Sequence, residues 1–324
     1  MLPIGVIIPT RNSMAYLPRH LETVREWCDG VEEVVIVDSE SKDGTVEYFK
    51  AHLPQKNVQI FSRPPGLYQA WNFGISQIKS KYLYISTVGD QMTKAGLEEL
   101  YAAAEKFQSD VVLSPPRLVD MQGNTVASKW PIERVIERHH IQQPCLLLPA
   151  DVLWSAVTAG EDSIMGSSAS NLYRAETMQR LPFSADYFRA GDMAWGIANS
   201  WKLKFAVVPK SFSTFLFHPK EEPDATGLWT KMSLLAQASV DEALQSAQLR
   251  TSSELQKLAE LLRLAREHEA AKLSLQPSGR KSIRWAFNVS GWKKRAERKR
   301  IKRRMDQLNA ELKDHILVGL IPEG

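Results

Sequence analysis

The sequence predicts an α/β protein with a mostly parallel central sheet and a helical extension after it. Two short apolar runs near the start, residues 6–8 and 34–37, are rich in β-branched residues, which is typical of strands buried on both faces. Between them, apolar residues recur at helical spacing over 16–27. Strand, helix and strand in this order predict a βαβ unit, whose two strands run in the same direction.

Polar residues follow both of these strands. Proline cannot donate a hydrogen bond to a sheet, so Pro9 ends the first strand. In open α/β sheets, ligands bind beyond the carboxyl ends of the strands. We therefore expect a binding site lined by Pro9, Thr10, Arg11, Asn12, Asp38 and Ser39. The alternative is that these side chains only cap helices. The sequence has neither G-x-G-x-x-G nor G-x-x-x-x-G-K-[ST], which argues against a dinucleotide fold and a P-loop.

The length and composition indicate one large domain with additional elements. A chain of 324 residues can bury a large core. Its two cysteines, Cys28 and Cys145, are far apart in sequence, so we expect no disulfide scaffold and a reducing compartment. No signal peptide and no apolar run of membrane-spanning length is apparent. We expect a cytoplasmic protein, either free or peripheral on the inner face of the membrane.

The pattern divides the chain into three parts: an α/β domain over 1–220, a helical extension over 221–276 and a basic tail over 277–324. Further strands are predicted at 58–61, 82–86, 111–113, 205–209 and 212–217, and further helices over 46–53, 70–79, 93–107 and 192–200. Residues 114–166 are interrupted by prolines and look less regular. In 251–273, a capping box and a leucine stripe predict a helix that either packs on the body or forms a homodimer seam.

Three motifs in this order resemble the inverting nucleotide-sugar glycosyltransferases of family two, which have the GT-A fold. The motifs are Pro9-Thr10-Arg11-Asn12 after an apolar strand, Val37-Asp38 with Ser41 and Asp43-Gly44-Thr45, and the run from Gly66 through Tyr68 and Asn72 to Ile75. The match runs through 4–100 and more loosely to about 219. The resemblance implies that Gly66, Tyr68 and Asn72 join the residues named above in binding a nucleotide diphosphate sugar.

The sequence departs from the family where a metal ion is usually held. Thr87 and Gly89 occupy the two positions of the usual Asp-x-Asp cluster, and Asp90 is the acid that remains. This looks like a subgroup with Gly-Asp in that place. One carboxylate together with substrate phosphates is enough for Mg²⁺, so we predict Mg²⁺ or Mn²⁺ at Asp90. His218 matches a third ligand of some GT-A enzymes, or is an ordinary histidine at a strand end.

The resemblance also implies a general base and an acceptor site. Asp192, in Ala190-Gly191-Asp192, matches the position of the family's base, with a helix cap as its alternative role and Asp186 as the competing carboxylate. Ser167 and Ser168 match a loop that contacts the acceptor. Trp195 is expected either to face the acceptor or to lie in the core.

The charge is concentrated near the carboxyl end. Residues 280–304 hold twelve Lys or Arg and one acid, a charge of +11 against +4 for the whole chain, so the rest carries −7. Aromatic residues precede the most basic run, as in segments that bind anionic membranes, and this would suit a lipid-linked acceptor. The alternative is a solvated helix packed on the body. No nucleic-acid-binding motif accompanies the charge, so nucleic acid is not the expected partner.

The favoured function is therefore a transferase that moves a sugar from a nucleotide diphosphate donor to a glycan or lipid-linked acceptor, in cell-envelope polysaccharide or glycoconjugate synthesis. A catalytically degenerate nucleotide-binding protein of the same fold is the alternative, because the metal cluster is eroded. A nucleotidyltransferase would carry a Gly- and Lys-rich loop after its first strand, and Thr10-Arg11-Asn12-Ser13 is not one.

Overall fold

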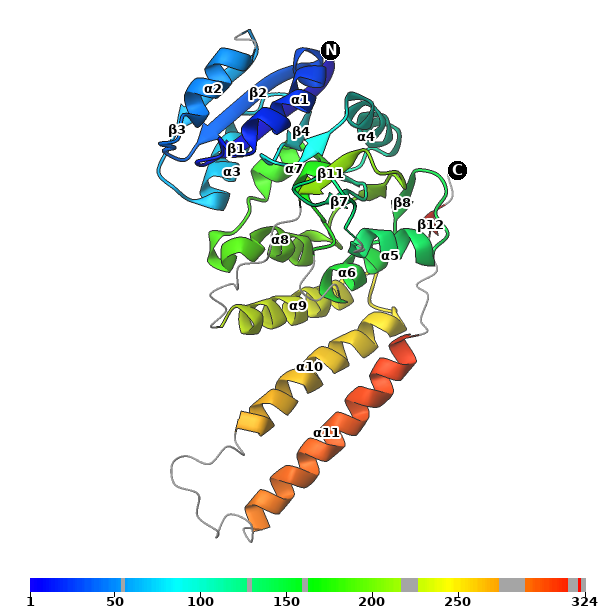
Figure 1. Cartoon of the computed structure of the whole chain (residues 1–324). Coiled ribbons are helices and arrows are strands. Elements are labelled where there is room, and N and C mark those ends of the chain that lie inside the picture. The colour runs from blue at the N-terminus through cyan, green and yellow to red at the C-terminus, as the bar shows by residue number, and fades with distance from the viewer. Residues whose placement is uncertain are drawn as a thin grey trace. The chain divides into compact units, whose positions relative to one another are not determined.

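The computed structural model describes residues 1–53, 56–126, 130–158, 163–216, 227–273, 289–313 and 320–321. The chain divides into two compact units, one of residues 1–228 and 318–324 and the other of residues 229–317 (Figure 1). Among the described residues, no helix is both long enough and apolar enough to span a bilayer.

The first unit is built on a nine-stranded sheet. Its strands, in spatial order, are β12 (Leu320–Ile321), β8 (Cys145–Leu147), β10 (Phe205–Val207), β6 (Val111–Leu113), β9 (Leu172–Arg174), β4 (Tyr82–Ile85), β1 (Leu2–Thr10), β2 (Val31–Asp38) and β3 (Val58–Ser62). The block β4-β1-β2-β3 is parallel, and β9 is antiparallel to both of its neighbours. A smaller sheet contains β5 (Gln91–Met92), β11 (Ser213–Leu216) and β7 (Arg117–Val119).

Helices accompany these strands along the chain. The α-helices of the first unit are α1 (Leu17–Trp27), α2 (Thr45–His52), α3 (Leu67–Gln77), α4 (Lys94–Phe107), α5 (Pro131–Arg138), α6 (Pro149–Thr158), α7 (Ala175–Arg180) and α8 (Gly191–Asn199). Three short 3₁₀ helices are η1 (Cys28–Gly30), η2 (Ser168–Ser170) and η3 (Ala185–Ala190). The predicted α/β class is confirmed, but α5, α6 and β8 lie in the segment that the sequence pattern left irregular.

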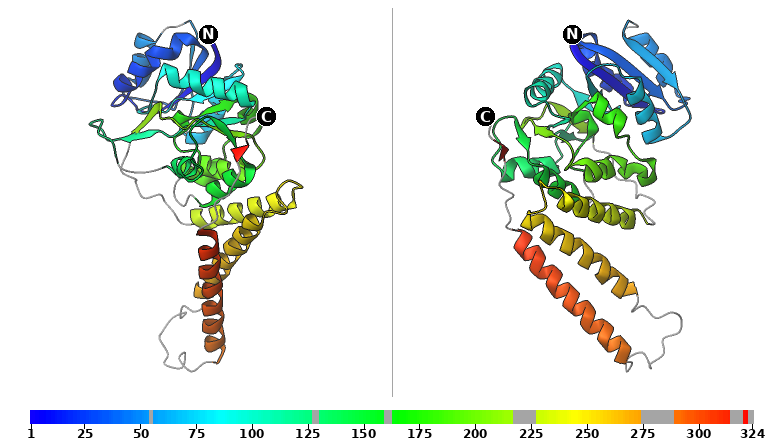
Figure 2. Two further views of the ribbon diagram at one scale, coloured as in Figure 1. Left: turned by 90° about the vertical axis from the view of Figure 1, so that its right-hand side faces the viewer. Right: turned by 180° about the vertical axis from the view of Figure 1, so that it is seen from behind.

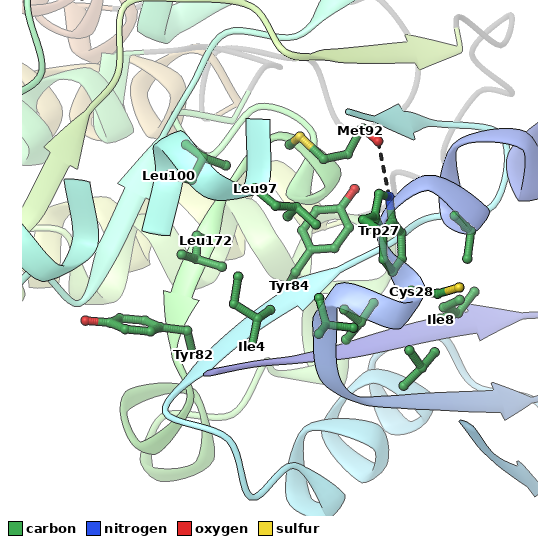
Figure 3. Close-up of a cluster of buried hydrophobic side chains, with 14 of the residues drawn as sticks. Ile4, Ile8, Trp27, Cys28, Tyr82, Tyr84, Met92, Leu97, Leu100 and Leu172 are labelled. Atoms are coloured by element: carbon green, nitrogen blue, oxygen red, sulfur yellow. Dashed lines mark hydrogen bonds between the residues drawn. The ribbon is translucent and has the colours of Figure 1, made fainter. Parts of the chain in front are cut away.

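The core follows from the alternation of side chains along the buried strands. Ile4 and Ile8 of β1 lie in one cluster with Trp27 of α1 and Leu97 of α4 (Figure 3). On the opposite face, Ile7 lies against α3 at Gly74, where an added Cβ would be 3.1 Å from its side chain. Both faces of β1 are therefore covered, which explains why its sequence is apolar without interruption.

The second unit is helical. It contains α9 (Leu228–Gln245), α10 (Ser253–Leu273) and α11 (Val289–Lys313), and α10 and α11 lie side by side (Figure 1, Figure 2). Leu264 of α10 packs with Ile301 and Leu308 of α11. The α10 residues of this cluster, Leu261 and Leu264, are not those of the predicted stripe, which are Leu255, Leu258, Leu262 and Ala265. The packing of the stripe and the homodimer seam therefore stay predictions.

Candidate functional site

The carboxyl ends of the parallel strands place the predicted site residues along one edge of the large sheet. Thr10 at the end of β1 pairs in register with Asp38 at the end of β2. The chain leaving β3 reaches the start of α3, and the chain leaving β4 reaches Asp90. Because these strands are parallel, Thr10, Asp38, the start of α3 and Asp90 all follow strand ends at the same edge.

Asp38 is a buried carboxylate that is only partly satisfied. Its side chain is 2% exposed, and its Oδ2 accepts a hydrogen bond from the backbone N–H of Ser41 at 2.9 Å. Its Oδ1 is buried and has no hydrogen-bond partner among the described residues. A buried carboxylate oxygen without a donor costs stability, so Asp38 offers a strong acceptor for a ligand.

Other residues of the first two motifs brace the loops around this acceptor. Asn12 Oδ1 accepts from the N–H of Lys42 at 2.9 Å, and the N–H of Asn12 donates to Ser41 Oγ at 2.8 Å. The N–H of Ser39 donates to the Thr10 carbonyl at 2.9 Å. Pro9 is half-buried at the end of β1 and Arg11 is exposed beside it. The contacts that Asn12 makes in the structure therefore fix the shape of the loops.

The third motif holds a different part of the edge together. Gly66 lies at the N-cap of α3, and Tyr68 follows in its first turn, 3% exposed. The Tyr68 hydroxyl lies 3.0 Å from the carbonyl of Arg189 and 3.1 Å from Asp192 Oδ1, and it accepts from the N–H of Asp192 at 3.0 Å. Burial raises the pKa of Tyr68, so the phenol keeps its proton and donates it to one of these two oxygens.

Asn72, one turn later on α3, anchors the chain that leads to Asp192. Its Nδ2 donates to the carbonyl of Phe183 at 2.8 Å, and its Oδ1 accepts from the N–H of Phe183 at 3.0 Å. Tyr68 and Asn72 together join the start of α3 to residues 183–192. Tyr68 and Asn72 therefore hold the segment that leads to the predicted base, Asp192.

Asp192 lies in the first turn of α8, partly buried. Its Oδ1 also accepts from the N–H of Met193 at 2.8 Å. Burial raises the pKa of the Asp192 carboxyl above its ordinary range, opposed by the hydrogen bonds from Met193 and Tyr68. The competing Asp186 is exposed. The environment of Asp192, and not that of Asp186, is suited to a carboxylate that takes up a proton.

The glycine before Asp192 has a steric explanation. A Cβ on Gly191 would lie 2.4 Å from Cε2 of Tyr68 and 2.7 Å from the carbonyl oxygen of Ser184. The backbone can therefore approach the Tyr68 ring this closely because residue 191 has no side chain. Trp195, one turn later, is 3% exposed and donates its Nε1–H to the carbonyl of Leu181 at 2.6 Å. Trp195 therefore lies in the core, the second of the two positions expected for it.

Asp90 lies where the two sheets meet. It is 4% exposed, its Oδ1 accepts from the N–H of Leu216 in β11 at 2.9 Å, and its Oδ2 accepts from Ser167 Oγ at 3.0 Å. Burial raises the pKa of Asp90 to about 7, although both hydrogen bonds lower it. Ser167 is thus a partner of Asp90, and Ser168, at the start of η2, is buried as well.

His20 is a residue of this site that sequence reasoning missed. Its Nδ1 lies 2.8 Å from the carbonyl of Asp90, and its Nε2 lies 3.2 Å from Ser86 Oγ. Burial lowers the pKa of His20 to about 4, so the ring is neutral. Because a carbonyl can only accept, Nδ1 carries the proton and Nε2 accepts from Ser86. One indication of this role is visible in the sequence, because His20 lies on the buried face of α1, whose other residues are apolar.

The described residues do not form a set of metal ligands. Within them there is no group of three or more His, Cys, Asp or Glu side chains that could hold a metal ion. Both oxygens of Asp90 already accept hydrogen bonds, and the protein donors hold the carboxylate in the core. The predicted third ligand, His218, lies outside the described residues. The described residues therefore form no preassembled cation site at Asp90, and a metal ion held by Asp90 together with substrate phosphates stays a prediction.

Part of the chain is similar in sequence to proteins of a known family. Residues 5–155, from β1 to α6, match the sequence profile of Glycosyl transferase family 2. This part of the chain is therefore similar to glycosyl transferase family 2 domains. The matched residues include Asp38, Tyr68 and Asp90, whereas Ser167 and Asp192 lie beyond them.

One curated relative is Glycosyltransferase GlyG of Streptococcus pneumoniae, which is 30% identical over 113 residues. The match covers 34% of this chain and 38% of that protein's length. Among solved structures, that of S. aureus TarS 1–349 in complex with UDP superposes with a TM-score of 0.57 at 16% identity, over 80% of this chain and 70% of that one. The same TarS fragment in complex with UDP-GlcNAc superposes with a TM-score of 0.57 at 14% identity, over 81% of this chain and 72% of that one. These superpositions show that the superposed part of the chain has the GT-A fold.

The contacts of Asp90 predict a structural effect of its removal. Asp90→Ala leaves the Leu216 N–H and the Ser167 hydroxyl without their acceptor, so we expect the free energy of unfolding to fall by about 1–3 kcal/mol. Urea titration of the full chain in EDTA measures this without bound metal. Asp90→Asn keeps one acceptor oxygen. Its free energy of unfolding should therefore lie between those of the wild type and Asp90→Ala. If Asp90→Ala is as stable as the wild type in EDTA, or more stable, Asp90 has no structural role and serves only to bind a ligand.

Proposed function

We propose that the protein is an inverting glycosyltransferase whose donor is a nucleoside diphosphate sugar. The observation that carries this proposal is the buried, unpartnered Oδ1 of Asp38 at the carboxyl edge of the sheet. It is suited to accept a hydrogen bond from the N–H of a pyrimidine base or from a ribose hydroxyl. The similarity to family 2 supports the proposal, as do the UDP and UDP-GlcNAc complexes of TarS, which has the same fold.

Asp192 is the general base of the proposed reaction. Its carboxylate takes the proton of the acceptor hydroxyl, whose oxygen then attacks the anomeric carbon on the side away from the nucleotide. The bond from that carbon to the diphosphate oxygen breaks, and its electron pair leaves with the nucleoside diphosphate, so the configuration inverts. Tyr68 and Met193 hold Oδ1, and we assign the acceptor proton to the second oxygen. The raised pKa of Asp192 makes the carboxylate a stronger base.

The acceptor is proposed to be a glycan or a lipid-linked sugar in cell-envelope synthesis. Mg²⁺ or Mn²⁺ at Asp90 and membership of the Gly-Asp subgroup are sequence predictions without support from the described donor set. The alternative of a degenerate binding protein keeps Asp38 and the nucleotide but has no use for Asp192. The two functions are therefore separated by variants at these two positions.

A membrane role for the basic helix has support from its faces. On α11, Ile301 and Leu308 pack with α10, and Arg304 makes two hydrogen bonds of 2.9 Å with Glu260. Lys299, Lys302 and Arg303 lie at helical spacing on the other side and are exposed. We infer that this exposed basic face binds the anionic surface of a membrane, where each cation contributes about 1 kcal/mol. The part of the predicted segment at 280–288 lies outside the described residues.

The first test of the proposed function is nucleotide binding. Asp38→Ala removes a charged acceptor from a buried hydrogen bond, so we expect UDP to bind about 10 to 100-fold more weakly, as measured by isothermal titration calorimetry. The control is Asp29→Ala, an exposed aspartate at the amino end of the same strand, which should bind UDP as the wild type does. If UDP, GDP, dTDP and their sugars all fail to bind the wild-type protein, the proposed function is wrong.

The second test separates catalysis from binding. Asp192→Asn keeps a hydrogen-bond acceptor for Tyr68 but cannot take a proton, so we expect kcat to fall by about 10² to 10⁴-fold with unchanged UDP affinity. In the wild type, kcat should rise with pH as Asp192 loses its proton, with a midpoint above the ordinary aspartate range. Asp192→Asn should lack this rise. Wild-type turnover in Asp192→Asn together with an inactive Asp186→Asn would move the base to Asp186.

The same variant has a predicted effect on stability. Because the folded state raises the pKa of Asp192, the carboxyl stabilises the fold most below the ordinary aspartate pKa, and this contribution is lost as the pH rises through the raised value. Asp192→Asn should therefore be more stable than the wild type at pH 7, and the difference should shrink in acid. Thermal unfolding at several pH values measures it.

The third test concerns the basic face. Replacing Lys299, Lys302 and Arg303 together by Gln should weaken binding to phosphatidylglycerol vesicles by about 100-fold at low salt, from about 1 kcal/mol for each charge. Added NaCl should weaken wild-type binding in the same sedimentation assay. The matched control replaces three exposed lysines of the first unit, Lys50, Lys56 and Lys79, by Gln. Equal losses in the two triple variants would contradict a specific membrane face.

A further inference from the structure

Phe188, in η3, combines two unfavourable features. Its backbone has φ 49° and ψ −124°, and its side chain is 66% exposed. The described non-glycine residues with positive φ are Asn12, Glu40, Gln108, His140 and Phe188. Polar residues, asparagine above all, tolerate this region by bonding locally, whereas a bulky aromatic residue there is a true outlier. Strained backbone in the protein persists where its surroundings enforce it.

The surroundings of Phe188 enforce its conformation from both sides. Upstream, both backbone polar groups of Phe183 are bonded to Asn72, and Ser184 Oγ accepts from the N–H of Asp186 at 3.2 Å. Downstream, the carbonyl of Arg189 lies 3.0 Å from the Tyr68 hydroxyl. The segment that carries Phe188 is therefore clamped onto α3, and the exposed ring is presented by a fixed backbone.

The clamp also places the carbonyl of Arg189, the residue after Phe188, close to the proposed base. The Tyr68 hydroxyl lies within about 3 Å of both the Arg189 carbonyl and Asp192 Oδ1. The Tyr68 oxygen thus lies between the Arg189 carbonyl and the Asp192 carboxylate, which is the proposed acceptor of the proton. The neighbouring aromatic residues Tyr68, Phe183 and Trp195 pack against one another in the core, each 3% exposed, so Phe188 differs from them in facing solvent.

We propose that the Phe188 ring is the platform on which a sugar ring of the acceptor packs. This inference rests on the proposed function, since it takes Asp192 as the group that meets the acceptor. A pyranose has a flat face of C–H groups that packs on an aromatic ring, while its hydroxyls point sideways to polar partners. Packing on Phe188 holds one hydroxyl toward Asp192 and covers an aromatic surface that is otherwise exposed to water.

The test uses methyl glycosides of glucose, galactose and N-acetylglucosamine as probes, with saturation-transfer NMR on the full chain in the presence of UDP. At least one should bind the wild type with transfer to the C–H protons of one ring face. Phe188→Ala should weaken that binding by about tenfold, and Phe188→Tyr should keep it within about twofold. Met121→Ala, at another exposed apolar side chain, should bind as the wild type does. No binding of any probe to the wild type overturns the proposal.

Phe188→Gly distinguishes a binding role from a structural one. Glycine adopts φ 49° without strain, so this variant should have an unchanged or higher Tm while losing the sugar signal. A lower Tm, or a retained sugar signal, would overturn the proposal. UDP binding, measured on the same samples, should be that of the wild type in every variant. Absence of UDP binding in the wild type counts against the proposed function, whereas normal UDP binding with unaffected sugar binding in Phe188→Gly counts against this inference alone.

Discussion

The buried carboxylate of Asp90 is the interaction on which the first unit depends. Its side chain joins the end of β4 in the large sheet to Leu216 in the small sheet and to Ser167 before η2, while its carbonyl accepts from His20 of α1. Burial of a carboxylate is costly unless its oxygens find donors. Here each oxygen has one, yet the pKa of Asp90 still rises to about 7, so loss of solvation outweighs the two bonds. A group this costly is retained where it joins several elements.

The motif at the start of α3 has an analogous positioning role for the proposed base. Tyr68 accepts from the N–H of Asp192, Asn72 bonds the backbone of Phe183, and Gly191 lets the segment between them lie against the Tyr68 ring. Asp192 lies beyond the residues that match the family 2 profile, whereas its supports lie within them. Residues within the matched part of the chain thus position a residue that lies outside it.

The parallel strands and their edge could be predicted because β-branched runs, a terminating proline and helical spacing are local features of the sequence. Asp38 followed from the same reasoning, since it comes directly after a buried run. The role of His20 could not be predicted, because its partners Ser86 and Asp90 are about seventy residues away. Helices α5 and α6 were missed because the prolines of 114–166 were interpreted as interruptions, whereas Pro131 and Pro149 are the first residues of these two helices. In the basic run, charge concealed Ile301 and Leu308, whose spacing of seven residues is that of a packed helix face.

Three unfavourable features of the first unit lie at or near the carboxyl edge of the parallel strands, and their location carries the functional argument. Among the described residues no donor reaches one oxygen of Asp38, Asp192 is a carboxylate that burial disfavours, and Phe188 is an exposed ring on a strained backbone. Each of these features lowers the stability of the free protein, although Asp192 also contacts Tyr68 of α3. A sequence selected for stability alone would lose all three. A donor to Asp38, a proton for Asp192 and a flat apolar partner for Phe188 would relieve them together, and a nucleotide sugar with its acceptor supplies all three.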